Sequence, residues 1–118
     1  MSSGIHFLDA RVPDGMRIYA IGDVHGCYDL LARIHRQIIA EIEQDAPADW
    51  RIIHLGDYVD RGPQSREVLD FLAKATAHDP RMIALMGNHD EGFLDFLANP
   101  TEARLFLDYG GLETAASY

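Results

Sequence analysis

The sequence alternates short apolar segments with longer helix-like segments, and this order limits the fold more than any other feature. Apolar residues dominate segments 17–21, 50–55 and 81–86, each of which is predicted to be a strand. The intervening segments 28–44 and 65–77 carry apolar residues at helical spacing, with charged residues on the remaining faces. Strands that alternate with helices are typical of a parallel sheet, so we predict an α/β fold.

Shorter helical segments follow the third predicted strand. A helix is predicted over 91–98, before the break at Pro100, and a further helical stretch over 101–107. Ser65 is expected to cap the second of the long helices. Residues 1–15 are expected to form a polar lead with little structure. The 118 residues therefore make one domain at most, built on a parallel β-α-β-α-β-α layer.

Charge and composition exclude several classes of protein. The formal net charge of −9 disfavours a nucleic-acid surface, because phosphate backbones recruit an excess of Lys and Arg. One cysteine, Cys27, excludes an internal disulfide and is consistent with a reducing compartment. No apolar run reaches membrane-spanning length, and the N-terminus lacks a secretory signal. We therefore expect a cytoplasmic chain with no nucleic-acid and no membrane partner.

Each predicted strand ends in a short polar block that contains glycine. The blocks are residues 22–26 (GDVHG), 56–62 (GDYVDRG) and 87–90 (GNHD). Their spacing is about thirty residues, the usual length of one strand-helix unit. Because the carboxyl ends of parallel strands share one sheet edge, the loops after them meet there. We therefore expect the polar side chains of the blocks to form one site.

The blocks contain residues suited to bind divalent cations. Asp23 and His25 offer an oxygen and an imidazole to the same side of an extended segment. Asp57 can bridge two cations about 3.5–4 Å apart, and Asn88 adds an amide oxygen for the second. Each residue alone is more common as an ordinary loop residue. Their joint occurrence at three strand ends favours a two-metal site of manganese, iron or zinc.

The same blocks contain residues suited to phosphoester hydrolysis. The planar guanidinium of Arg61 can hold two phosphoryl oxygens at once. His89 can act as general acid toward the leaving oxygen if a neighbouring group stabilises its protonated form and fixes its tautomer, and the Asp60 carboxylate in the next loop can do so. We therefore predict a phosphoesterase in which a metal-bound hydroxide attacks phosphorus. A purely structural metal is a weaker interpretation, because it leaves Arg61 without a role.

The remaining histidines and large aromatic residues have structural interpretations. His54 lies within a predicted strand and is expected in the core. Surface positions are expected for His6, His35 and His78. Packing roles are expected for Trp50, Tyr109 and Tyr118.

At these blocks the chain resembles the calcineurin-like metallophosphoesterases. It resembles most the phosphoprotein phosphatase group, whose motifs are GDxHG, GDxVDRG and GNH(E/D) in this order. Residues 56–62 match the second motif at every position, whereas Asp90 stands where that family commonly has Glu. Residues 110–118 resemble the segment that follows the third motif in bacterial serine/threonine phosphatases. The resemblance implies the N-terminal half of a β-sandwich flanked by helices.

The resemblance implies the same roles that the residue types suggest. These are metal ligands at Asp23, His25, Asp57 and Asn88, a phosphate-binding Arg61, and an acid pair of His89 and Asp60. Two divalent cations are expected, with manganese favoured. The implied substrates are phosphorylated proteins or small phosphoesters. A related group hydrolyses diadenosine polyphosphates and often lacks an acid where Asp60 stands, which favours the phosphoprotein phosphatases here.

Length is the main departure from the resemblance. Family members are roughly twice as long, still within the size of one domain, and supply two further metal-binding histidines. We therefore expect a truncated chain that binds one cation well and the second weakly, with low or no activity. We also expect an uncovered sheet surface and self-association through it. The alternative is a non-catalytic module that binds phosphate ligands or a partner chain.

Overall fold

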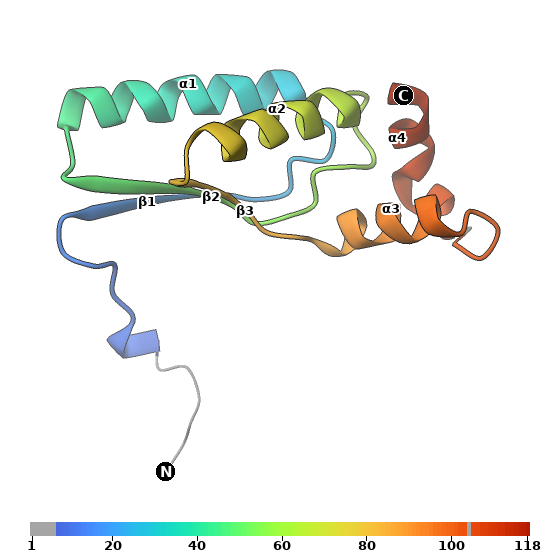
Figure 1. Cartoon of the computed structure of the whole chain (residues 1–118), viewed down its shortest axis with the longest axis horizontal. Helices are drawn as coiled ribbons and strands as arrows, with labels where there is room; N and C mark the ends of the chain where they lie inside the picture. Colours follow the sequence, from blue (N-terminus) through green and yellow to red (C-terminus); the bar gives the residue numbers. More distant parts are fainter. Residues whose placement is uncertain (1–6, 104) are drawn as a thin grey trace, which may run out of the picture.

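The sheet contains three parallel strands. The structure is a computed structural model and describes residues 7–103 and 105–118 (Figure 1). Strand β2 (Asp49–His54) lies in the centre and pairs with β1 (Met16–Ile21) on one side and β3 (Met82–Ala84) on the other. The strand order follows the chain, as expected for strands joined by helical crossovers. The predicted α/β class and parallel pairing are therefore confirmed.

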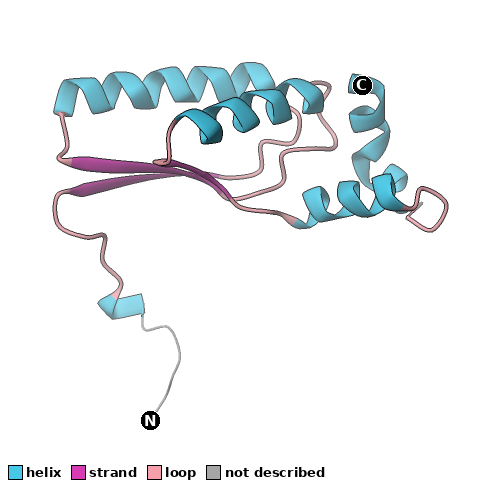
Figure 2. Ribbon diagram, viewed as in Figure 1, coloured by secondary structure: helices cyan, strands magenta, loops and turns pink. Residues whose placement is uncertain are grey.

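Two long helices cover one face of this sheet, as Figures 1 and 2 show. α1 (Tyr28–Asp45) connects β1 to β2, and α2 (Ser65–His78) connects β2 to β3. None of the helices in the described part of the chain has the length and apolar character needed to span a bilayer. The shorter elements are η1 (Phe7–Asp9), α3 (Asn88–Ala98), η2 (Leu107–Gly111) and α4 (Leu112–Ser117).

The core lies between the long helices and the sheet. Alternate residues of β2, namely Trp50, Ile52 and His54, are buried, as expected for a strand with one face against helices. A second cluster joins residues of both helices to residues of the polar blocks: Val24, Leu31, Tyr58, Val68 and Leu72. Because Val24 and Tyr58 belong to the first two blocks, core packing holds those blocks at the sheet edge.

The opposite face of the sheet carries apolar side chains. The register pairs Ala20 with Ile53 and Ile53 with Ile83, and neighbouring Ile18 is 38% exposed. In Figure 1, α1 and α2 lie on the other face, and of the described helices only the single-turn η1 is drawn below the strands on this side, away from them. The predicted uncovered sheet surface is therefore present, and self-association through it stays a prediction.

Two predicted boundaries differ from the structure near the third polar block. β3 ends at Ala84 instead of residue 86, because the chain leaves the sheet there to enter the block. α3 begins at Asn88 instead of residue 91. It starts early because the Asp90 carboxylate accepts the backbone N–H of Gly87 at 2.9 Å and thereby caps the first turn.

The predicted capping role of Ser65 is wrong. Gln64 is the residue that precedes the first turn of α2, and Ser65 is the first residue of the helix. The Ser65 side chain is fully buried, with its Oγ 3.1 Å from Oγ1 of Thr114. The hydroxyl is therefore used in a tertiary contact and does not cap the helix.

The helix predicted over 101–107 is also wrong in its bounds. Residues 101–103 are not helical, whereas among the described residues Leu105 and Phe106 are helical and the run continues through η2 into α4. Gly110 interrupts it with a positive φ of 105°, which glycine adopts without steric penalty. The chain therefore kinks at Gly110 and resumes its helix in α4, a continuation that was not predicted from the sequence.

The surface position predicted for His35 is wrong, whereas the core position of His54 is confirmed. His35 is 6% exposed, and its Nε2 lies 2.8 Å from Nε2 of His54. His54 Nδ1 donates to the Ile83 carbonyl at 2.9 Å, so Nε2 of His54 accepts the hydrogen bond from His35. His35 is buried because it lies one helical turn after the buried Leu31, on the inner face of α1.

The other structural interpretations have mixed outcomes. Trp50 is buried and His78 is exposed, as predicted. Tyr109 is 65% exposed, so its predicted packing role is wrong, because the residue lies at the kink of η2. Tyr118 is 61% exposed and packs only part of its ring against a neighbouring aromatic residue. The prediction for His6 lies outside the described residues.

The buried histidine pair predicts acid-sensitive stability. Burial lowers the pKa of His35 to about 4, with a smaller contribution from His54, and burial also lowers the pKa of His54. Unfolded histidine titrates near 6.5, so acid protonates the unfolded chain first. The pair's contribution to the free energy of unfolding is therefore complete above about pH 6.5 and is lost as the pH falls toward about 4.

Urea unfolding at a series of pH values measures this effect. We expect the free energy of unfolding of a His35→Gln variant to fall less between pH 7 and 4 than that of the unmodified chain. A His78→Gln variant is the matched control, because His78 is exposed and should leave the pH profile unchanged. Identical profiles for His35→Gln and the unmodified chain would contradict the expectation.

Candidate functional site

The first two polar blocks lie side by side at the carboxyl ends of the strands. His25 N–H donates to the Asp57 carbonyl at 2.9 Å, and Gly26 N–H donates to the Tyr58 carbonyl at 2.8 Å. Gly62 N–H returns a hydrogen bond to the His25 carbonyl at 3.0 Å. These backbone contacts pair the two loops along their length, as strands pair in a sheet.

Several site residues have an unusual backbone conformation. In the described part of the chain, the non-glycine residues with positive φ are Ala46 and five residues of these two loops. The five are Asp23, His25, Asp57, Asp60 and Arg61, with φ between 42° and 76°. A left-handed conformation costs a non-glycine residue about 1–2 kcal/mol, so the surrounding hydrogen bonds and packing must hold these residues.

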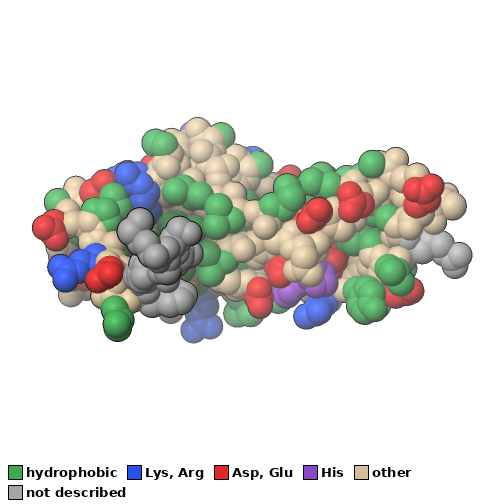
Figure 3. All heavy atoms as spheres, turned by 90° about the horizontal axis from the view of Figure 1, so that it is seen from below, with side chains coloured by type: hydrophobic (Ala, Val, Ile, Leu, Met, Phe, Trp, Pro, Cys, Tyr) green, Lys and Arg blue, Asp and Glu red, His purple; other side chains and the backbone are tan. Residues whose placement is uncertain are grey.

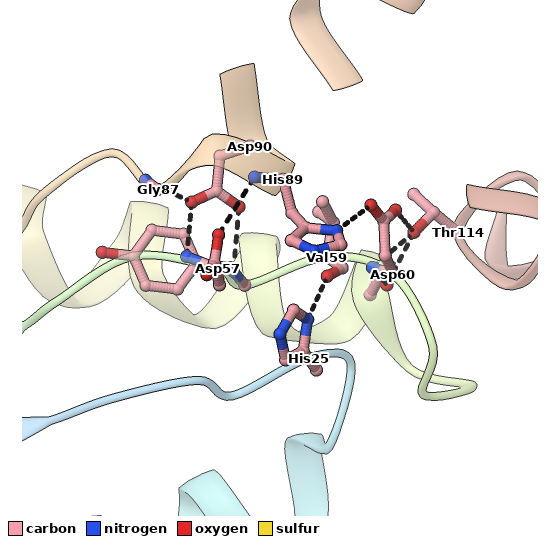
Figure 4. Close-up of polar contacts among 10 residues, drawn as sticks. His25, Asp57, Val59, Asp60, Gly87, His89, Asp90 and Thr114 are labelled. Atoms are coloured by element: carbon pink, nitrogen blue, oxygen red, sulfur yellow. Dashed lines mark hydrogen bonds and ion pairs between the residues drawn. The ribbon is translucent and has the colours of Figure 1, made fainter. Parts of the chain in front are cut away.

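Three side chains of the loops form a potential metal-binding group. One ligand atom each from Asp23, His25 and Asp57 lies within 4.8 Å of the other two. His25 Nδ1 lies 2.9 Å from the Val59 carbonyl, so it carries the proton and leaves the lone pair on Nε2 (Figure 4). Two carboxylates and a neutral imidazole suit manganese, iron or zinc, so the residues present fit a divalent cation.

His89 and Asp60 form a buried pair next to this group. His89 Nδ1 lies 2.8 Å from Asp60 Oδ2, and the side chains are 13% and 1% exposed. Because a carboxylate only accepts, Nδ1 carries the proton and Nε2 is the ring nitrogen left for a substrate. The His89 ring packs edge to face against the His25 ring at 4.8 Å between centroids. The structure therefore brings together the predicted acid pair and three of the four predicted metal ligands, namely Asp23, His25 and Asp57.

Asp90 joins the second and third blocks through three backbone groups. Its carboxylate accepts the N–H of Asp57 at 2.7 Å, of Tyr58 at 2.8 Å and of Gly87 at 2.9 Å (Figure 4). Asp57 Oδ1 in turn accepts the backbone N–H of His89 at 3.0 Å. No role for Asp90 was predicted from the sequence, although its place three residues after Gly87 is the position of a capping-box acid.

Arg61, Asn88 and His89 border one cavity. The cavity has a volume of about 470 Å³ and is lined by these three residues, by Asp60, by other residues of α3 and by residues between 102 and 109 that follow it. Asp23, His25 and Asp57 do not line it. On the face seen in Figure 3, histidine, acidic and basic side chains lie next to one another. Arg61, Asn88 and His89 thus lie around one cavity, next to the potential metal-binding group.

The fold and the three polar blocks are typical of the metallophosphoesterase superfamily. The calcineurin-like phosphoesterase family matches residues 16–117, and the chain belongs to that family. The resemblance noted from the three polar blocks is therefore confirmed.

Individual relatives have two kinds of named activity. Over 75 residues the chain is 44% identical to the symmetrical bis(5′-nucleosyl)-tetraphosphatase of Methylococcus capsulatus, a match over 64% of this chain and 24% of the relative. It is 32% identical over 94 residues to serine/threonine-protein phosphatase 1 of Salmonella typhimurium, a match over 80% of this chain and 38% of the relative. It is 33% identical over 102 residues to the asymmetrical bis(5′-nucleosyl)-tetraphosphatase PrpE of Bacillus velezensis, a match over 82% of this chain and 38% of the relative. The matches thus span less than half of each relative's length.

Proposed function

We propose that the strand-end site carries metal-ion-dependent hydrolysis of phosphomonoesters. One observation carries this proposal: the potential metal-binding group and the His89–Asp60 pair are in contact, with the rings of His25 and His89 4.8 Å apart. A metal site alone suits many functions, and a histidine-carboxylate pair alone is common. The two are in contact next to a cavity that Arg61 borders, and this combination supports phosphoester chemistry in particular.

The first part of the proposal concerns the cations. Asp23 and His25 would hold one cation, Asp57 would bridge to a second, and Asn88 would offer its amide oxygen to that second cation. The mixed oxygen and nitrogen donors favour manganese, with iron and zinc as alternatives. When bound, such cations act as Lewis acids toward the phosphoryl oxygens and activate water for in-line attack.

The second part concerns the residues that act on the phosphoryl group. Arg61 would bind two of its oxygens with the guanidinium fork. His89 would donate the Nε2 proton to the leaving oxygen, while the Asp60 carboxylate on Nδ1 stabilises the imidazolium form. Asp60 therefore orients the ring and balances its charge without contacting the substrate.

The substrate has two alternatives. The names of the matched relatives support either a phosphorylated protein or a dinucleoside polyphosphate. The Asp60 carboxylate behind His89 favours the phosphoprotein phosphatase alternative. Hydrolysis rates for a phosphoserine peptide and for diadenosine tetraphosphate, measured on the same preparation with manganese, separate the alternatives. Binding of both without hydrolysis of either would favour a non-catalytic phosphate-binding module.

Calorimetric titration with manganese tests the cation part of the proposal. We expect an Asp57→Asn variant to bind manganese at least about tenfold more weakly, because even groups that only support metal ligands commonly contribute 10–100-fold in affinity. The same variant should lose manganese-dependent hydrolysis of p-nitrophenyl phosphate.

An Asp95→Asn variant is the matched control for this titration. Asp95 borders the cavity but lies outside the potential metal-binding group, so its substitution should leave manganese affinity unchanged. Equal manganese affinity of the Asp57→Asn variant and the unmodified chain would contradict the proposed cation site.

A further inference from the structure

A buried threonine of α4 contacts the carboxylate that holds His89. Thr114 is fully buried, and its Oγ1 lies 2.7 Å from both the backbone N and the Oδ1 of Asp60 (Figure 4). Ser65 Oγ lies 3.1 Å from the same hydroxyl. The sequence separation between Asp60 and Thr114 is 54 residues, so this contact is part of the tertiary structure.

The donors and acceptors of this cluster have one consistent assignment. The Asp60 carboxylate only accepts, so the Thr114 hydroxyl donates its proton to Oδ1. The lone pairs of Thr114 Oγ1 are then free to accept the N–H of Asp60 and the hydroxyl of Ser65. Asp60 Oδ2 is left for His89 Nδ1 at 2.8 Å. Each carboxylate oxygen of Asp60 thus has its own side-chain donor.

We propose that Thr114 is a positioning residue that aims the Asp60 carboxylate at His89. The backbone N–H of Asp60 holds the Thr114 hydroxyl in place, and that hydroxyl donates to Oδ1, so the carboxylate cannot rotate away from His89 without breaking its hydrogen bond with Thr114. The consequence for catalysis depends on the proposed function, in which His89 protonates the leaving group. The orientation of the pair does not depend on it.

The segment before Thr114 acts on the neighbouring residue in the same way. Arg61 N–H donates to the Gly110 carbonyl at 3.0 Å, and a Cβ at Gly110 would come within 2.8 Å of Arg61 Cγ. Asp60 and Arg61 have positive φ values of 76° and 72°. The kinked segment from Gly110 to Thr114 therefore supports the strained pair that presents both the acid partner and the phosphate-binding arginine.

Proton NMR of the metal-free chain tests the positioning role directly. The Nδ1 proton of His89, hydrogen-bonded to a buried carboxylate, should give a downfield resonance that disappears in a His89→Gln variant. We expect Thr114→Val, which keeps the shape but removes the hydroxyl, to lose or shift this resonance. Thr114→Ser should retain it. Thr114→Ala removes the same hydroxyl without a bulky replacement and serves if the valine variant does not fold.

Ser117→Ala is the control on the same helix, because its Oγ contacts the Thr114 carbonyl at 2.7 Å and not Asp60. It should leave the resonance in place. An unchanged resonance in a folded Thr114→Val or Thr114→Ala variant, or its loss in Thr114→Ser, would overturn the proposal.

Hydrolysis rates separate this proposal from the proposed function. Thr114→Val should lower kcat for a phosphoserine peptide by about ten- to a hundredfold, as expected for a misplaced catalytic group, and lower kcat for p-nitrophenyl phosphate less. If the unmodified chain hydrolyses neither compound, the proposed function fails, and the resonance still decides the role of Thr114. If Thr114→Val lowers kcat equally for both compounds while the resonance is unchanged, the positioning role is contradicted and the proposed function is not.

Discussion

A His89→Gln variant is expected to hydrolyse a phosphoserine peptide about 10²–10⁴-fold more slowly than the unmodified chain, the usual contribution of a general acid. The serine alkoxide is a poor leaving group and needs the proton that Nε2 would donate. p-Nitrophenolate leaves without protonation, so the same variant should lose much less activity toward p-nitrophenyl phosphate. The measurement is kcat for both compounds with saturating manganese.

The informative quantity is the ratio of the loss in kcat for the phosphoserine peptide to the loss in kcat for p-nitrophenyl phosphate. His78→Gln provides the control, because His78 is exposed at the end of α2 and should change neither rate. Equal losses for both compounds would contradict a general-acid role and assign His89 to binding the phosphoryl group or a cation.

An Asp90→Ala variant is expected to lose about 3 kcal/mol or more of unfolding free energy, because three backbone donors lose a charged acceptor. Such a loss is a large share of the 5–15 kcal/mol typical of a domain. Asp90→Asn keeps one oxygen acceptor and should lose less. Urea unfolding at pH 7 measures the differences.

Asp95→Ala is the matched control for the stability measurement. Asp95 lies on the same helix with an exposed carboxylate, so its loss should change the free energy of unfolding by no more than about 0.5 kcal/mol. A similar loss for both alanine variants would show that Asp90 does not join the blocks in solution.

The sequence was sufficient to predict the sheet, the two long helices and the meeting of the polar blocks. These follow from local periodicity, because a strand followed by an amphipathic helix leaves few alternatives to a parallel crossover. The contact between His89 and Asp60 was predictable for the same reason, since both residues directly follow neighbouring strands. The His25 and Asp57 pairing follows equally from adjacent strand ends.

Other features required the tertiary structure. Thr114 meets Asp60 across 54 residues, and no local pattern indicates which hydroxyl of a terminal helix contacts a given carboxylate. The kink at Gly110 and the continuation of the helix into α4 were not predicted, because a glycine after a helical run normally terminates the helix. His35 was different: its spacing from Leu31 placed it on the inner face of α1, and that signal was present in the sequence.

The left-handed backbone of the paired loops has a consequence for ligand capture. Hydrogen bonds within the chain, such as those donated by the N–H groups of His25 and Arg61, hold these loops in their unusual conformations. The ordering entropy of these loops is therefore lost during folding and not during association. Such preorganisation implies little induced fit, so the affinity for a phosphoryl ligand is set by contacts and desolvation.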